Sequence, residues 1–145
     1  MDIRSFLNKE EEAQILDAIK TAESVTSGEI RLHLESTTKK SSLDRATDVF
    51  KQLKMHKTEL HNGVLIYLAV EDKKFAIIGE KGINEAVPAN FWDNIKDHMQ
   101  SKFKLGEFTQ GIVDGIKMAG EQLAHHFPHQ GEDDINELSD DISIG

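Results

Sequence analysis

Cysteine is missing from this 145-residue chain, so disulfide bonds, thiolate metal sites and thiol nucleophiles are excluded. The chain has 2 prolines and only three arginines, at positions 4, 31 and 45, so lysine supplies most of the positive charge. No apolar run approaches the roughly 20 residues that span a bilayer. The N-terminus lacks the apolar centre of a signal peptide. These absences predict a cytoplasmic protein without membrane insertion.

Positive charge is also in deficit. Lysine and arginine together number 17, aspartate and glutamate number 26, and the formal net charge is −9. A nucleic-acid partner would need a basic face, and none is visible in the sequence. An acidic surface instead favours cations as small partners. At this length we expect one domain, and we expect it to be a monomer.

The first half of the chain alternates helical and strand patterns. Asn8 can cap a helix over residues 9–25, because three glutamates follow it and apolar residues recur with helical spacing. Residues 29–36 alternate between apolar and polar side chains, which predicts a strand with one buried face. After a polar loop, Ser41 or Ser42 can cap a second amphipathic helix that extends to about residue 54.

The second half begins with an apolar run over residues 64–70, typical of a central strand that is covered on both faces. A short charged turn leads to another strand over residues 75–78, and the short connection makes this pair antiparallel. A short helix follows. Pro88 then suits the start of a longer helix. A final amphipathic helix covers residues 108–123.

Strand, helix and strand form a crossover unit, so the first two strands should be parallel. The predicted fold is α/β: a three-layer α/β/α sandwich around a small, mainly parallel mixed sheet with one antiparallel hairpin strand. We predict a single domain over residues 1–127. Residues 128–145 form a predicted acidic tail, since the segment from 131 onward carries six acids and no base.

Ligands of open α/β sheets bind beyond the carboxyl ends of the strands. At this edge the topology brings together Glu35, Asp44, Glu71 and Asp72, and carboxylates of this kind bind Ca²⁺ or Mg²⁺. We therefore predict these four residues as metal ligands. A second interpretation stays open, in which Asp44 only stabilises a helix N-terminus and residues 71–74 form a charged turn.

Two other groups compete with this site. The opposite edge of the predicted sheet holds Glu29, Asn62, Glu80 and Glu85, and Glu80 is the strongest rival to the first site. The histidines of segment 125–129 could bind zinc or nickel, but the chain contains no H-E-x-x-H helix to support them. No G-x-S-x-G elbow or Walker-type loop occurs.

Several segments resemble the TPM domain family. The sequence G-E-I at residues 28–30 opens an alternating strand, and Asp44 precedes Ala46 by two residues in the following helix. The segment NGVLIYLAVEDKKFAIIGEKGINE, residues 62–85, combines an apolar strand, a charged turn and a glycine-punctuated exit. The F-x-x-G-I motif at residues 108–112 also fits. The resemblance covers roughly residues 7–127.

This resemblance implies an α/β/α sandwich that binds divalent cations, calcium foremost, at an acidic crevice between strand-end loops. By position, Asp44, Glu71 and Asp72 match the family pattern, whereas Glu35 is added by topology. The resemblance also leaves open an acid phosphatase activity on phosphomonoesters. No nucleophile can be assigned, so a metal-activated water is the mechanism to test first.

A different class of function is a noncatalytic protein-interaction module, which would use the strand-end crevice or the acidic tail. Apolar residues interrupt the acids of the tail: Ile135, Leu138, Ile142 and Ile144. They could dock on a protein partner or fold back onto the domain. A disordered tail is the third interpretation.

Overall fold

The computed structural model describes residues 3–55, 62–128 and 142–145. The strands are β1 (Glu29–Glu35), β2 (Gly63–Ala69), β3 (Lys74–Gly79) and β4 (Ser143–Ile144). The helices are η1 (Ile3–Ser5), α1 (Lys9–Glu23), α2 (Ser42–Gln52), α3 (Lys81–Ala86), α4 (Asp93–Lys104) and α5 (Phe108–His126). The four strands form one sheet in the order β3-β2-β1-β4.

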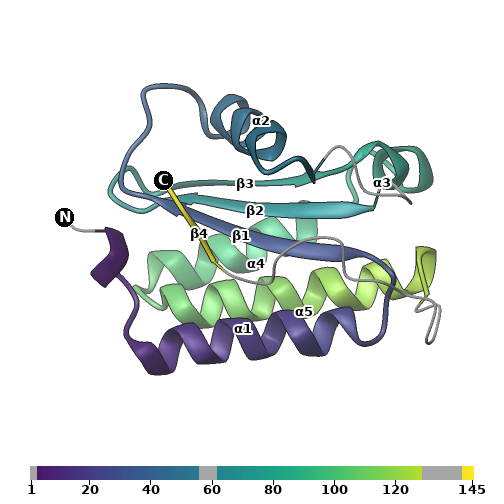
Figure 1. The fold of residues 1–145 in the computed structure, drawn as a ribbon, viewed down its shortest axis with the longest axis horizontal. Coiled ribbons are helices and arrows are strands. Elements are labelled where there is room, and N and C mark those ends of the chain that lie inside the picture. The colour runs from purple at the N-terminus through teal and green to yellow at the C-terminus, as the bar shows by residue number, and fades with distance from the viewer. Residues whose placement is uncertain (1–2, 56–61, 129–141) are drawn as a thin grey trace.

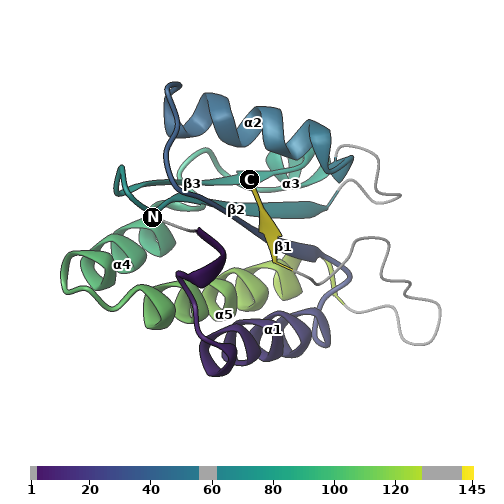
Figure 2. The same ribbon diagram turned by 60° about the vertical axis from the view of Figure 1, so that its left-hand side comes forward.

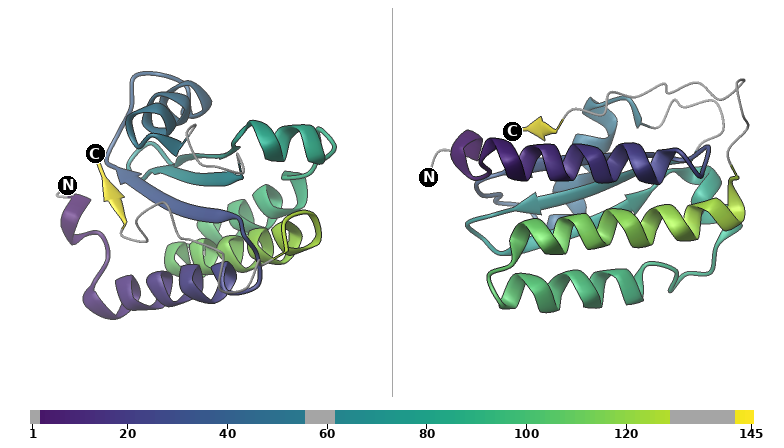
Figure 3. Two further views of the ribbon diagram at one scale, coloured as in Figure 1. Left: turned by 45° about the vertical axis from the view of Figure 1, so that its right-hand side comes forward. Right: turned by 90° about the horizontal axis from the view of Figure 1, so that it is seen from below.

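The elements lie in three layers, as predicted. Helix α2 covers one face of the sheet, and α1, α5 and α4 cover the other face (Figure 1; Figure 2). Seen from below, these three helices lie side by side with α5 in the middle (Figure 3). The sheet thereby separates a larger apolar core from a smaller one under α2. Within the described residues, no helix is both long and apolar enough to cross a membrane.

Strand β2 is the central strand that its apolar sequence predicted, because all seven of its residues are buried. It pairs in parallel with β1 along the full length of both strands and antiparallel with β3. Glu35 at the end of β1 lies opposite Ala69 at the end of β2. The loops that follow β1 and β2 therefore leave the sheet at the same edge (Figure 1).

The helix starts follow local capping chemistry. Asn8 forms a capping box with Glu11, and the Ser41 hydroxyl accepts a hydrogen bond from the Asp44 amide. The predicted helix start at Pro88 was wrong, because α4 begins at Asp93. Residues 88–92 form tight turns instead, in which the Phe91 amide donates to the Pro88 carbonyl and the Asp93 amide to that of Asn90.

Part of the predicted acidic tail belongs to the sheet. Residues 143 and 144 form β4, which pairs in parallel with β1 at His33 and Leu34. For these residues, the interpretation that the tail folds back onto the domain is confirmed. Residues 129–141, which hold Ile135 and Leu138, lie outside the described residues. The predicted division after residue 127 stays a prediction.

Candidate functional site

The loops after β1 and β2 are tied together by Asp72. Its carboxylate accepts hydrogen bonds from the Thr37 hydroxyl, at 2.9 and 2.8 Å to its two oxygens, and from the Thr38 amide at 2.7 Å. The Glu71 amide also donates to the Ser36 carbonyl at 2.8 Å. The hairpin turn is thus fastened to the β1–α2 loop, and one carboxylate is fixed between them.

Lys73 makes the turn itself, since its φ of 55° lies in the left-handed region. The bonds from the Thr38 amide and the Thr37 hydroxyl hold the pKa of Asp72 below its ordinary value. Asp72 is half-buried and ionised, and its neighbour Glu71 is exposed. The charged turn predicted from the sequence therefore has a specific role in joining two loops.

Asp44 follows the β1–α2 loop directly in the chain, and its local role is to stabilise the start of α2. It is exposed in the first turn of α2, where the helix dipole favours a negative charge. The helix starts from the same end of the sheet at which β1 and β2 end (Figure 1). Asp44, Glu71 and Asp72 thus approach this end from two chain segments, the start of α2 and the β2–β3 turn.

Glu35 is held in a different environment. Its buried carboxylate accepts hydrogen bonds from Arg45 Nε at 2.8 Å, from Arg45 Nη2 at 2.9 Å and from the Tyr67 hydroxyl. The His33 ring nitrogen Nε2 lies 3.0 Å from the carboxylate oxygen Oε1. Because an ionised carboxylate only accepts, Nε2 carries the proton and Nδ1 accepts from the Ser143 hydroxyl at 2.8 Å.

These contacts determine the charges in the network. Burial by itself raises the pKa of Glu35, but the bonds from Arg45, Tyr67 and His33 outweigh it and lower that pKa to about 2. Burial lowers the pKa of His33, against an opposing effect of Glu35. Burial and Glu35 both raise the pKa of Tyr67. The resting network therefore holds one ionised carboxylate and one guanidinium, with neutral histidine and tyrosine.

The structure does not gather the four predicted ligands into one group. Glu35 is already neutralised by Arg45, and turning it toward a cation would break a buried ion pair. Within residues 3–55, 62–128 and 142–145, no three His, Asp or Glu side chains come close enough to hold a metal ion. The acidic edge therefore consists of Asp72 and its neighbours, and the Glu35 network lies beside it.

The rival edge is built from buried polar groups. The Glu80 carboxylate accepts from the Gly63 amide at 3.1 Å, and the Asn62 side chain donates to the Ser27 hydroxyl at 3.2 Å. Glu29, Asn62 and Glu80 are all buried. These contacts of Asn62 and Glu80 join the chain segments at the starts of β1 and β2, which is a structural role.

The histidine prediction falls partly outside the described part of the chain. His125 and His126 lie in the last turn of α5, and the His126 ring contacts Phe91. His129 lies outside the described residues.

The sequence prediction missed the partners of Glu35. The signal was present in β1, because the polar residues Arg31, His33 and Glu35 alternate and so share one face. Arg45 is one of only three arginines and lies in the helix that covers this face. Arg31 Nε is buried and has no hydrogen-bond partner in the described part of the chain.

The layers, the sheet order and the acidic strand-end edge define a class of small α/β/α domain. The chain belongs to the TPM domain family, because the sequence model of the TPM domain matches residues 1–122. The search among curated proteins found no match.

Solved structures agree with this assignment. The chain is similar to the BA42 protein from the psychrophilic bacterium Bizionia argentinensis, at 56% identity and a TM-score of 0.90, over 97% of this chain and 96% of that one. Two further structures share the fold alone. The N-terminal domain of a P. gingivalis protein is 17% identical with a TM-score of 0.70, over 87% of this chain and 83% of that one. The N-terminal domain of the cg2496 protein from Corynebacterium glutamicum is 11% identical with a TM-score of 0.65, over 81% and 74%.

Proposed function

We propose that this domain binds a partly hydrated divalent cation, Ca²⁺ or Mg²⁺, at the edge formed by residues 36–44 and 70–73. The observation that supports the proposal is the fixed carboxylate of Asp72, which the Thr37 hydroxyl and the Thr38 amide orient between two loops. A ligand whose rotamer is already fixed loses less conformational entropy when it binds.

The donor set suits hard cations that keep part of their water shell. Ca²⁺ accepts carboxylate, hydroxyl, carbonyl and water oxygens, and Mg²⁺ usually keeps several waters beside one or two carboxylates. In this proposal Asp72 is the anchoring ligand and Glu71 adds a second charge. Asp44 contributes electrostatic attraction for the cation, through its negative charge at the start of α2. Glu35 is left out, since its oxygens are committed to Arg45, Tyr67 and His33. A site with so few protein ligands should bind with modest affinity.

Phosphatase activity stays a prediction from the family resemblance. A bound cation could supply an activated water for attack on a phosphomonoester. If the domain hydrolyses such an ester, activity should disappear with EDTA and return with excess Mg²⁺ or Ca²⁺. Binding itself does not depend on this activity.

The acidic edge can be tested by replacing Glu71 with glutamine and Asp72 with asparagine in one variant. The asparagine side chain would keep an acceptor oxygen for the Thr38 amide, so the loops should stay joined. Loss of two negative charges should leave the metal-free melting temperature unchanged or slightly raised, because like-charge repulsion falls. The calcium-dependent rise in melting temperature, which follows from binding to the folded state, should disappear.

A matched control removes two exposed acids that are not part of residues 36–44 or 70–73: Asp97→Asn on α4 combined with Glu121→Gln on α5. This variant has the same net charge as the test variant, so general screening by calcium acts on both alike. It should keep the full calcium-induced rise. A test variant that also keeps the full rise would refute Asp72 and Glu71 as ligands.

A further inference from the structure

Among the described residues, the outer edge of β1 is only partly paired. Strand β1 pairs with β2 over seven residues, whereas its pairing with β4 covers His33 and Leu34. A backbone bond from the Gly145 amide to the Leu34 carbonyl, at 2.9 Å, fixes the end of this short strand. Within the described residues, the paired part of β4 covers two of the seven residues of β1, and a strand edge of this kind is a surface that binds peptide strands.

Along the outer side of β1, residues 143 and 145 contact one set of β1 groups, because alternate residues of a strand point to the same side. The Ser143 hydroxyl bonds to the buried His33 ring. At Gly145, an added Cβ would lie 2.5 Å from Glu35 Oε1 and 2.6 Å from His33 Nε2. Both groups are buried and fixed by hydrogen bonds, so they cannot move aside. This side of the segment therefore requires a small hydroxyl residue and then a glycine.

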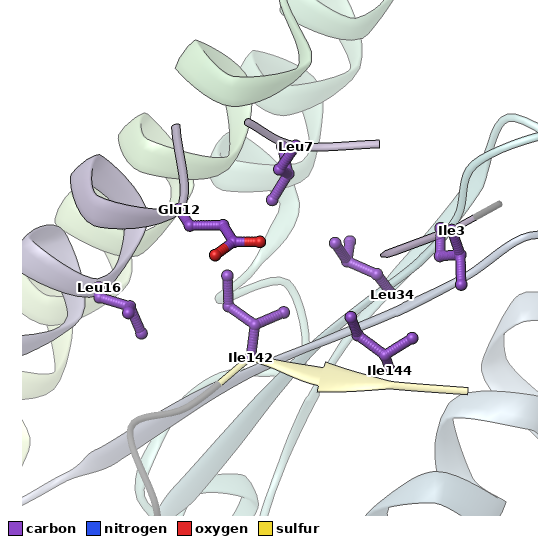
Figure 4. Close-up of a pocket in the computed structure, with 7 residues that line it drawn as sticks. All are labelled: Ile3, Leu7, Glu12, Leu16, Leu34, Ile142 and Ile144. Carbon is purple, nitrogen blue, oxygen red and sulfur yellow. The ribbon is translucent and has the colours of Figure 1, made fainter. Parts of the chain in front are cut away.

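The other side of the segment faces a cavity of about 260 Å³ between α1, β1 and the residues before α1. Ile142 and Ile144 line it together with apolar side chains such as Leu16 and Leu34 (Figure 4). Glu12 is the charged group in this lining, and Figure 4 shows its carboxylate directed toward Ile142. Among the described residues Glu12 forms no ion pair. The cavity thus has room for a longer side chain at position 142, and a counter-charge for a basic one.

We propose that the outer edge of β1 is a docking site for an extended segment of a partner protein, running parallel to β1. The preferred pattern is a lysine or another long side chain, then serine or threonine, then an aliphatic residue, then glycine. Residues 142–145, with the sequence Ile-Ser-Ile-Gly, are the built-in occupant that the partner displaces. The partner segment binds more tightly than a free peptide with the sequence of this occupant, because its first side chain fills the cavity and reaches Glu12.

The test uses the full chain with Gly145→Val, in which the added side chain should unseat the built-in segment. Three six-residue peptides are titrated and followed by amide shifts of β1: the sequence of residues 140–145, the same peptide with Ile142→Lys, and the same peptide with Gly145→Val. The first should shift the His33 and Leu34 amides. The lysine peptide should bind about two- to fivefold more tightly at low salt. The valine peptide should bind about tenfold more weakly or not at all.

Two further variants keep the result interpretable. Glu12→Gln should remove the advantage of the lysine peptide and leave the first peptide unaffected. A chain with Ile142→Asp and Ile144→Asp releases the built-in segment by a different route and should bind the same peptides in the same order. Absence of β1 shifts in both released chains, or equal binding of the valine peptide, would overturn the proposal. So would a concentration-dependent dimer of the unmodified chain, since the occupant would then be a second copy.

Discussion

Replacing Glu35 with glutamine should destabilise the domain by about 3–5 kcal/mol, the usual cost of leaving one member of a buried ion pair without its partner. Arg45 would keep its charge beside a neutral amide, and the amide NH₂ would face an Arg45 donor together with that of either Tyr67 or His33, depending on which oxygen it replaces. The side chain of Glu35 is 6% exposed, so solvent cannot replace the lost acceptor. Urea or thermal unfolding at neutral pH measures the loss directly.

The same residue predicts how stability depends on pH. Its pKa is about 2 in the folded protein and 4.5 for an ordinary glutamate. The stability that this difference contributes, roughly 3 kcal/mol at about 1.36 kcal/mol per pKa unit, is fully present above pH 4.5. It should be lost as the pH falls from 4.5 toward 2. The Glu35→Gln variant should lack this part of the acid sensitivity.

Asp48→Asn is the matched control. Asp48 also belongs to an ion pair at α2, with Lys40 at 2.6 Å, but that pair is at the surface. Exposed pairs contribute little to stability. The control should therefore unfold almost like the unmodified chain, and equal losses in the two variants would show that burial of the Glu35 network has been misjudged.

Truncating Leu65 or Ile66 to alanine should cost about 2–5 kcal/mol each. Both side chains are fully buried on β2, but they point to opposite faces of the sheet: Leu65 into the smaller core under α2 and Ile66 into the larger core. Each variant thus removes packing from one layer. For a chain of this size the melting temperature should fall by roughly 2–4 °C per kcal/mol.

Leu105→Ala provides the comparison for Leu65→Ala, because the chemical change is the same and Leu105 is 72% exposed. Its cost should stay within about 0.5 kcal/mol. Losses of similar size at positions 65 and 105 would mean that β2 is not the buried centre of the sheet.

The parts of the fold that the sequence could predict are those with a repeating local signal. A continuous apolar run, without the alternation of a one-sided strand, identified β2 as covered on both faces, and Asn8 followed by glutamates identified the start of α1. The parallel pairing of β1 and β2 followed from the helix between them. Pro88 misled, because proline fits the turns before α4 as well as a helix start.

The parts that the sequence could not predict depend on contacts between different elements of the fold. Topology placed Glu35 correctly at the carboxyl end of β1. The side-chain alternation of β1 puts Glu35 on one face of the sheet with Arg31 and His33, and the structure shows that this face meets α2 and Arg45. A carboxylate near other carboxylates can serve a metal or an internal arginine, and the sequence alone does not distinguish these uses. Strand β4 was missed for a similar reason. A strand of two residues, Ser143 and Ile144, is too short to show a repeating sequence pattern, and its conformation is set by pairing with the outer edge of β1.

The central claim is that the cation binds at the Asp72 edge, and amide shifts during a calcium titration of the isotope-labelled chain test it most directly. We expect calcium-dependent shifts concentrated at residues 36–38, around residue 44 and at residues 70–73, with a weaker response to Mg²⁺ at the same positions. Shifts confined instead to residues 79–85 and the start of β1 would place the ion at the opposite edge with Glu29 and Glu80. The absence of any localised shift would contradict cation binding by this domain.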